Sequence, residues 1–187
     1  MDLVSRAKNI LTTPKTEWPV IAGEGTSPGA LFSGYVAPLA AIPPVATIIG
    51  NLLFSGAMTF GQSVAVGIIN FVIALVGVWV LGLIASKIAP SFGGKDDLTQ
   101  GLKLVGYAYT AAWVAGIVNL VPALAVLAII GGIYSLYLLY AGGSVMMSVP
   151  RDRSGSYTVV VILVAIGLYI VIGIVVGVVI AAVSLVH

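Results

Sequence analysis

One stretch of the sequence decides the fold. Residues 150–186 read PRDRSGSYTVVVILVAIGLYIVIGIVVGVVIAAVSLV, a short basic turn followed by a run without a charged residue from Tyr157 to Val186. A run of about 20 apolar residues can cross the hydrocarbon core of a bilayer as an α-helix, because each residue adds about 1.5 Å. Arg151 and Arg153 stand just before this run. The stretch therefore predicts a transmembrane helix that starts at a basic face.

The same pattern of a basic segment beside a long uncharged run recurs along the chain. It predicts an all-α polytopic transmembrane helical bundle, a single domain over residues 1–187, with about five spans and a short N-terminal amphipathic helix. The apolar runs are too long, and alternate too little, for the strands of a membrane barrel. The expected spans lie near residues 31–54, 64–86, 104–121, 123–149 and 157–186.

The positions of the cations orient this bundle. Every Lys and Arg lies before the first span, beside the connection after the second span, or in the connection after the fourth. Cytoplasmic segments of membrane proteins are enriched in Lys and Arg. We therefore expect a cytoplasmic N-terminus and, since the number of spans is odd, a C-terminus outside. The cations are Arg6, Lys8, Lys15, Lys87, Lys95, Lys103, Arg151 and Arg153.

The composition excludes several classes of function. Only 7% of the residues are charged, against roughly one quarter in soluble domains. The chain has no cysteine and one histidine, His187, which leaves no basis for thiolate metal sites or histidine catalysis. The cations mark membrane boundaries and form no basic patch of the kind that binds nucleic acid. No base is placed to activate a hydroxyl group, so we expect no catalytic residue, cofactor, metal or enzyme activity.

The first residues form a candidate membrane-contact segment. Apolar residues at helical spacing, among them Leu3, Ala7 and Ile10, predict a short amphipathic helix that ends before Pro14. We expect residues 1–28 to lie at the cytoplasmic membrane surface, with cations at anionic headgroups and the apolar face at the acyl boundary. The alternative is that this helix packs on the transmembrane bundle or frays. The predicted membrane-surface contacts are Arg6, Lys8, Lys15 and Trp18.

Prolines predict a broken helix in the first span. Pro38 and the pair Pro43-Pro44 remove backbone donors, so the freed carbonyls need partners inside the protein. Interrupted helices at membrane depth often line cavities. A hydrogen bond to another helix is the alternative role of Asn70. For Tyr107 and Tyr109 the alternative is a position at the membrane interface. The candidate cavity-lining residues are Pro43, Pro44, Asn51, Asn70, Tyr107 and Tyr109.

The last span carries small residues on one helix face. Gly173, Gly177 and Ala181 are spaced four residues apart. Small residues let helix backbones approach closely, and in lipid this packing is a main source of helix association. We predict a helix contact on this face. Its partner is either another helix of the same chain or a second copy.

The largest polar connection contains its own turn and capping signals. Gly93-Gly94 predicts the turn, and Asp97 precedes the apolar positions of the next helix. An aspartate there can accept hydrogen bonds from the free N–H groups of the first turn and opposes the positive helix end. We therefore expect Asp97 to be the N-cap of the third span.

A set of residues in the first two thirds of the chain forms a recognisable pattern. It comprises Asn9-Ile10-Leu11, Pro14, Glu17-Trp18, Ile21, Glu24, Gly34-Tyr35-Val36, Pro38-Leu39, Ile42-Pro43 and Gly106-Tyr107-Ala108-Tyr109. This pattern resembles bacterial members of the Yip1 domain family. The resemblance implies a five-span helical protein of the inner membrane with a cytoplasmic N-terminus and no assigned reaction. Eukaryotic relatives engage prenylated small GTPases through a longer N-terminal region that this sequence lacks, so GTPase binding is not carried over.

Two functions of different classes are consistent with these features. The first is a non-enzymatic membrane protein that organises membrane or protein partners, with the N-terminal segment and residues 87–103 as its cytoplasmic contact surfaces. The expected partners are the lipid bilayer and a membrane protein or a second copy of the chain. The alternative is a small uncoupled channel or carrier for a lipid or neutral solute. A subunit whose partner supplies the activity is a third hypothesis.

Overall fold

The computed structural model describes residues 2–56 and 58–184 and, within them, all side chains except those of residues 55, 169 and 175–184. Every regular element in these ranges is helical, which confirms the predicted all-α class. Short π- and 3-10-helical segments continue or join the α-helices. The α-helices are α1 (Leu3–Thr12), α2 (Pro14–Gly23), α3 (Pro28–Leu31), α4 (Ala37–Ala40), α5 (Ile42–Gly50), α6 (Phe60–Ile88), α7 (Leu98–Ala108), α8 (Thr110–Ala115), α9 (Ala128–Met146) and α10 (Arg151–Ser184). The other segments are η1 (Phe32–Val36), η2 (Asn51–Ser55), η3 (Ala89–Phe92), η4 (Gly116–Leu120) and η5 (Pro122–Leu127).

Five helical segments are long and apolar enough to cross a membrane, which confirms the predicted bundle of five spans. The third segment starts at Leu98, earlier than the expected position near residue 104, because Asp97 caps the helix there. The expected end of the last span near residue 186 lies outside the described residues. The segments are Pro28–Phe54, Phe60–Phe92, Leu98–Leu120, Pro122–Met146 and Arg151–Ile174.

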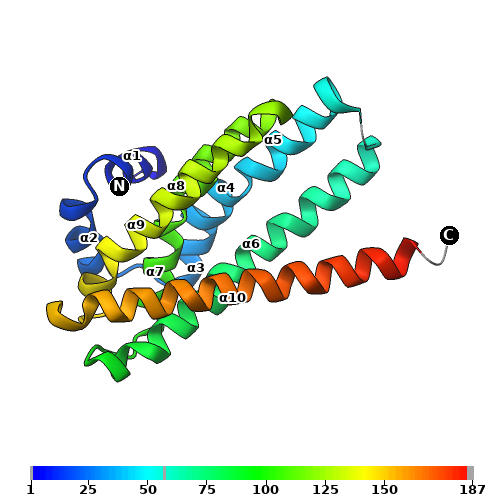
Figure 1. The fold of residues 1–187 in the computed structure, drawn as a ribbon. Coiled ribbons are helices and arrows are strands. Elements are labelled where there is room, and N and C mark those ends of the chain that lie inside the picture. Colours follow the sequence, from blue (N-terminus) through cyan, green and yellow to red (C-terminus); the bar gives the residue numbers. More distant parts are fainter. Residues whose placement is uncertain (1, 57, 185–187) are drawn as a thin grey trace.

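The segments that carry the cations gather at one end of the bundle, which we call the basic end. Figure 1 shows α1 and α2, the connection between α6 and α7, and the turn before α10 at this end. The Lys95 N–H donates to the Met147 carbonyl at 2.9 Å, which joins two of these segments directly. The connection from η2 to α6 and the turn from η4 to η5 lie at the other end, which we call the opposite end (Figure 1).

The third span lies at the centre of the bundle. In its most apolar segment 67% of the residues are buried, against 28% or fewer in each other span. Small residues allow its neighbour α6 to come very close, since a Cβ added at Gly82 would lie 2.9 Å from the Leu102 Cα. The fully buried Trp18, Leu104 and Tyr157 pack in the same core. The best-packed part of the protein therefore lies toward the basic end.

The first span is interrupted at the predicted prolines. α4 ends at Ala40, and α5 starts again at Ile42 with Pro43 in its first turn. Since neither Pro43 nor Pro44 has a backbone N–H, the carbonyls of Leu39 and Ala40 lose the partner that an uninterrupted α-helix would provide. The π-helical segments η1 and η2 lie on either side of this break. The predicted interruption is confirmed.

The connection between the second and third spans also follows the prediction. Gly93 has a φ of +82°, a left-handed conformation that glycine adopts without strain. Asp97 accepts a hydrogen bond from the Gln100 N–H at 3.0 Å and is the N-cap of α7. Asp96 instead pairs with Lys87 at 2.6 Å on the protein surface.

Candidate functional site

Two short helices, α1 and α2, fold onto the basic end, and we call them the N-terminal helix pair. Ala7 and Ile10 on the apolar face of α1 are buried in the protein. The Tyr134 hydroxyl donates to the Leu11 carbonyl at 2.7 Å, and Gln100 donates to the Ala22 carbonyl at 3.0 Å. The pair is therefore held by contacts with the spans and is part of the folded core.

Arg6 joins α1 to α2 through ion pairs, and contacts with the third span link this network to the bundle. Its guanidinium forms ion pairs with Glu17 and Glu24 and lies 5.9 Å from the centre of the Tyr107 ring. Lys103 donates to the backbone carbonyl of Glu24 at 2.7 Å. Arg6 and Lys103 are 4% and 0% exposed. Buried charges are costly unless they are paired, so each member of this network depends on the others.

The prediction that Arg6 and Trp18 contact the membrane surface is wrong. Trp18 is fully buried, and a Cβ added at Gly142 would lie 2.7 Å from its Cζ2 atom. Arg6 turns inward because Glu17 and Glu24 neutralise its charge inside the protein. The alternative, in which the amphipathic helix packs on the bundle, is confirmed.

The other two cations of the N-terminal helix pair point outward. Lys8 and Lys15 are exposed, as are Lys95, Arg151 and Arg153 on the neighbouring segments of the basic end. The exposed cations of the basic end thus lie on several segments, where Arg153 also pairs with Asp152 at 3.9 Å. Contact of Lys8 and Lys15 with the membrane surface stays a prediction.

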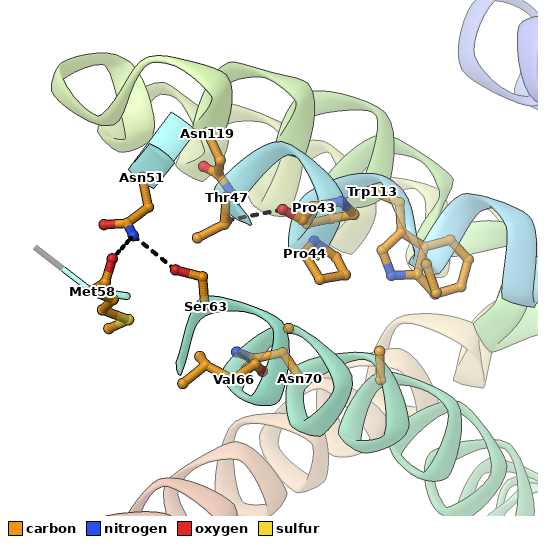
Figure 2. A pocket seen from close by; sticks show the side chains of 13 residues that line it. Pro43, Pro44, Thr47, Asn51, Met58, Ser63, Val66, Asn70, Trp113 and Asn119 are labelled. Carbon is orange, nitrogen blue, oxygen red and sulfur yellow. Dashed lines mark hydrogen bonds between the residues drawn. The ribbon is translucent and has the colours of Figure 1, made fainter. Parts of the chain in front are cut away.

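A cavity of about 380 Å³ lies between α5 and α6 toward the opposite end (Figure 2). The structure brings four of the candidate cavity residues together in its wall: Pro43, Pro44, Asn51 and Asn70. Further neutral side chains line the wall, which contains no charged residue. Four of them, polar or aromatic, were not among the predicted cavity-lining residues, because no pattern in the sequence relates them to the prolines. They are Thr47, Ser63, Trp113 and Asn119.

Asn51 closes one end of the cavity. Its amide donates to the Met58 carbonyl at 3.0 Å and to the Ser63 hydroxyl at 2.8 Å, which ties η2 to the start of α6 (Figure 2). Asn70 instead donates to the Val66 carbonyl of its own helix at 3.0 Å. The prediction that Asn70 bonds to another helix is therefore wrong for the described residues, and Asn51 makes such a bond instead. Asn70 leaves part of its amide toward the cavity.

The two candidate tyrosines lie elsewhere. Tyr107 lines a separate cavity at the basic end, together with Arg6 and Glu24, and its ring centre lies 4.4 Å from that of Tyr35. It is 5% exposed, so an interfacial position is excluded. Tyr109 lines a further cavity between α8 and α9. Both tyrosines therefore line cavities, but neither lines the cavity of the prolines, and the cavity of Tyr107 lies at the basic end.

Gly173, the first of the small residues predicted to form a contact face on α10, packs against no other described part of the chain. A Cβ added at Gly173 would have no atom within 4 Å. Gly177 and Ala181 lie among the residues whose side chains are not described. The contact within the chain is therefore absent at Gly173, and contact with a second copy stays a prediction.

The chemistry that these sites offer is binding through hydrogen bonds and charge. No group of three or more His, Cys, Asp or Glu side chains in the described part of the chain could hold a metal. The basic end presents cations to the outside, whereas the cavity between α5 and α6 presents neutral donors and acceptors.

A comparison with known protein families identifies the family of this chain. The Yip1 domain model matches residues 8–175, which is most of the chain. The chain belongs to the Yip1 domain family. In this Yip1 protein, Glu17, Trp18, Glu24, Tyr35 and Tyr107, all in the pattern that carried the resemblance, gather around the N-terminal helix pair. Much of that pattern therefore builds the basic end.

Two curated relatives match this chain over most of their own length. The chain is 23% identical over 168 residues to the inner membrane protein YohC of Escherichia coli strain K12, covering 83% of this chain and 85% of the relative. The YohC protein of Escherichia coli O6:H1 strain CFT073 matches with the same values. No solved structure matches the chain. The family and the five membrane-capable helices identify a Yip1 membrane protein.

Proposed function

We propose that this Yip1 protein is a non-enzymatic integral protein of the inner membrane that organises membrane or protein partners at its basic end. The inner-membrane relatives support the location. The gathering of cations at one end supports an orientation with the N-terminus in the cytoplasm and the C-terminus outside.

One observation carries this proposal: the N-terminal helix pair is fixed by buried ion pairs and still exposes Lys8 and Lys15. A contact surface that is ordered before binding loses less conformational entropy when a partner binds. Anionic headgroups attract such cations with about 1 kcal/mol for each Lys or Arg near the surface. The same surface suits an acidic segment of a membrane-protein partner.

The experiment is a purification of tagged protein in mild detergent, with mass spectrometry of the retained proteins and lipids. The double variant Lys8→Gln, Lys15→Gln should lose anionic lipid or a stoichiometric protein partner that the wild type retains. The matched control is Lys8→Arg, Lys15→Arg, which keeps both charges and should retain what the wild type retains. Identical retained molecules in the Gln variant and the wild type would overturn the proposal.

A second candidate function is an uncoupled channel or carrier for a lipid or neutral solute. It is favoured by the cavity between α5 and α6, which lies beside the proline break. Flux through proteoliposomes should then fall when Asn70 or Trp113 is replaced by an apolar residue. Flux equal to that of empty liposomes would rule this candidate out.

A further inference from the structure

The cavity between α5 and α6 contains polar groups that the fold leaves without partners. Trp113 lines it at 5% exposure, and its indole N–H makes no hydrogen bond to any described residue. The Asn119 amide, also in the wall, likewise makes none within the described ranges. Ala40 also lines this cavity, and its carbonyl lacks the helical partner that residue 44 would provide, because Pro44 has no N–H. Unpaired polar groups at membrane depth are costly unless a ligand or water meets them.

The chemistry of the wall selects a neutral ligand with hydroxyl groups. Charged ligands would lose their hydration without an opposite charge, since no lining residue is charged. The wall offers both a donor, the Trp113 N–H, and acceptors such as the Asn70 and Asn119 amide oxygens. A hydroxyl group donates and accepts, so a group with several hydroxyls can meet partners of both kinds.

The dimensions and borders of the cavity favour a lipid over a free solute. Its wall follows α6 from Ser63 to Ala74, which corresponds to about 16 Å at the helical rise and to about half of the hydrocarbon thickness of a bilayer. Val66 and Met58 in the wall are 38% and 45% exposed. Apolar side chains thus border the opening, where acyl chains would lie against them.

We propose that this cavity binds a lipid with a neutral, hydroxyl-bearing headgroup from the leaflet at the opposite end. The headgroup lies between α5 and α6 and bonds to Trp113, Asn70 and Asn119, and the acyl chains follow the exposed aliphatic surface of α6. The proposal goes beyond the contact function of the basic end and requires no transport. Either one can fail while the other holds, because Lys8 and Lys15 are remote from this cavity.

Native mass spectrometry of the full chain, purified without sugar detergents, tests the site. The probe is monohexosyl diacylglycerol, compared with phosphatidylglycerol of the same acyl chains. The wild type should retain the neutral lipid preferentially. Trp113→Phe and Asn70→Leu should each weaken retention about three- to ten-fold, the effect of losing one hydrogen bond. Asn70 is exposed on α6, so Asn70→Leu tests the site without disturbing the core.

The matched control is Trp79→Phe, the same change at a residue that is 43% exposed on α6 and lies outside the cavity. It should retain the lipid as the wild type does. Equal retention of the neutral and anionic lipids, or equal losses in Trp113→Phe and Trp79→Phe, would overturn the proposal. Displacement of the lipid by free methyl hexoside at equal concentration would overturn the lipid assignment, because it would show that the acyl chains contribute nothing.

Discussion

The basic end and the opposite end of this Yip1 bundle both place polar groups inside a membrane protein, but they satisfy them differently. At the basic end the buried groups are charged, and Arg6, Glu17 and Glu24 compensate one another. At the opposite end the groups are neutral, and Trp113 and Asn119 line a cavity without partners. The division is not complete, because the buried Trp18 Nε1 and Gln100 Oε1 at the basic end make no hydrogen bond to a described residue, and Asn51 at the opposite end makes two. The ends differ chiefly in charge: the basic end holds charged groups that compensate one another, and the opposite end holds neutral groups that line a cavity.

This difference indicates which end tolerates change. A charge that loses its partner inside a protein is strongly destabilising, whereas a neutral group beside a cavity can meet water or a ligand. Substitutions of the buried charged groups at the basic end should therefore act mainly on stability. Those at the opposite end should act mainly on binding.

Removal of the Arg6 charge should have the largest effect. Arg6→Met leaves the buried Glu17 carboxylate without its cation, and we expect a loss of about 3–5 kcal/mol in the free energy of unfolding. The measurement is unfolding in mixed detergent micelles, followed by tryptophan fluorescence. Protease cleavage within the N-terminal helix pair should increase in parallel.

Lys8→Met is the control for Arg6→Met, because Lys8 is exposed on the same helix. It should change the free energy of unfolding by less than about 0.5 kcal/mol. The double variant Arg6→Met, Glu17→Met should recover much of the loss, since it removes both charges together. Equal destabilisation by Arg6→Met and Lys8→Met would contradict a stabilising ion-pair network.

Close packing of α6 on the third span should give the next largest effect. A Cβ at Gly82 would meet the Leu102 backbone at 2.9 Å, so Gly82→Ala should cost about 1–3 kcal/mol through forced separation of the helices. Gly77→Ala on the same helix is the control, since nothing lies within 4 Å of a Cβ there. It should be neutral or slightly stabilising, because alanine favours the helix. Thermal unfolding in detergent separates the two outcomes.

Much of the fold could be predicted from the sequence because the membrane imposes it. A span must be long, apolar and internally hydrogen-bonded, and its charges must lie at its ends. Those constraints act residue by residue, so the spans, the proline break at Pro43 and the N-cap at Asp97 were visible in the order of residues alone.

The candidate sites were harder to predict because they depend on partners that are distant in sequence. Taken by itself, the sequence of α1 has the pattern of a membrane-surface helix. Arg6 nevertheless faces the protein, because it pairs with Glu17 and Glu24. Pro14 and Glu17 did signal a second short helix, since proline is favoured at the first helical position and acidic residues in the first turn. Nothing local indicated that Trp113 would reach the proline break.

A smaller effect on stability should follow from the variant that alters the cavity. Asn70 is exposed on α6 and bonds only within its own helix among the described residues, so Asn70→Leu should change the free energy of unfolding by less than about 0.5 kcal/mol. The loss in lipid retention expected for the same variant should therefore appear without a loss of fold. A decrease in stability comparable to that of Gly82→Ala would show that the stability of the opposite end is as sensitive to substitution as that of the basic end.

The smallest effect should be a pH dependence confined to the start of α1. The Ser5 N–H and hydroxyl donate to the Asp2 carboxylate at 2.9 and 2.7 Å, and these hydrogen bonds lower the pKa of that carboxyl below its ordinary value. A lowered pKa in the folded state means that the stabilisation is present above the ordinary carboxyl pKa of about 3.9 and is lost as the pH falls through the folded value.

Hydrogen exchange at the Ser5 amide should therefore accelerate in acid in the wild type, after correction for the intrinsic rate. Asp2→Asn keeps a capping oxygen that does not titrate, so its protection should not change with pH, whereas Asp2→Ala should exchange fast throughout. Because the Arg6 ion pairs hold the rest of the helix, the loss of protection should stop within the first turn, and its spread into α2 would show that the N-terminal helix pair depends on this cap.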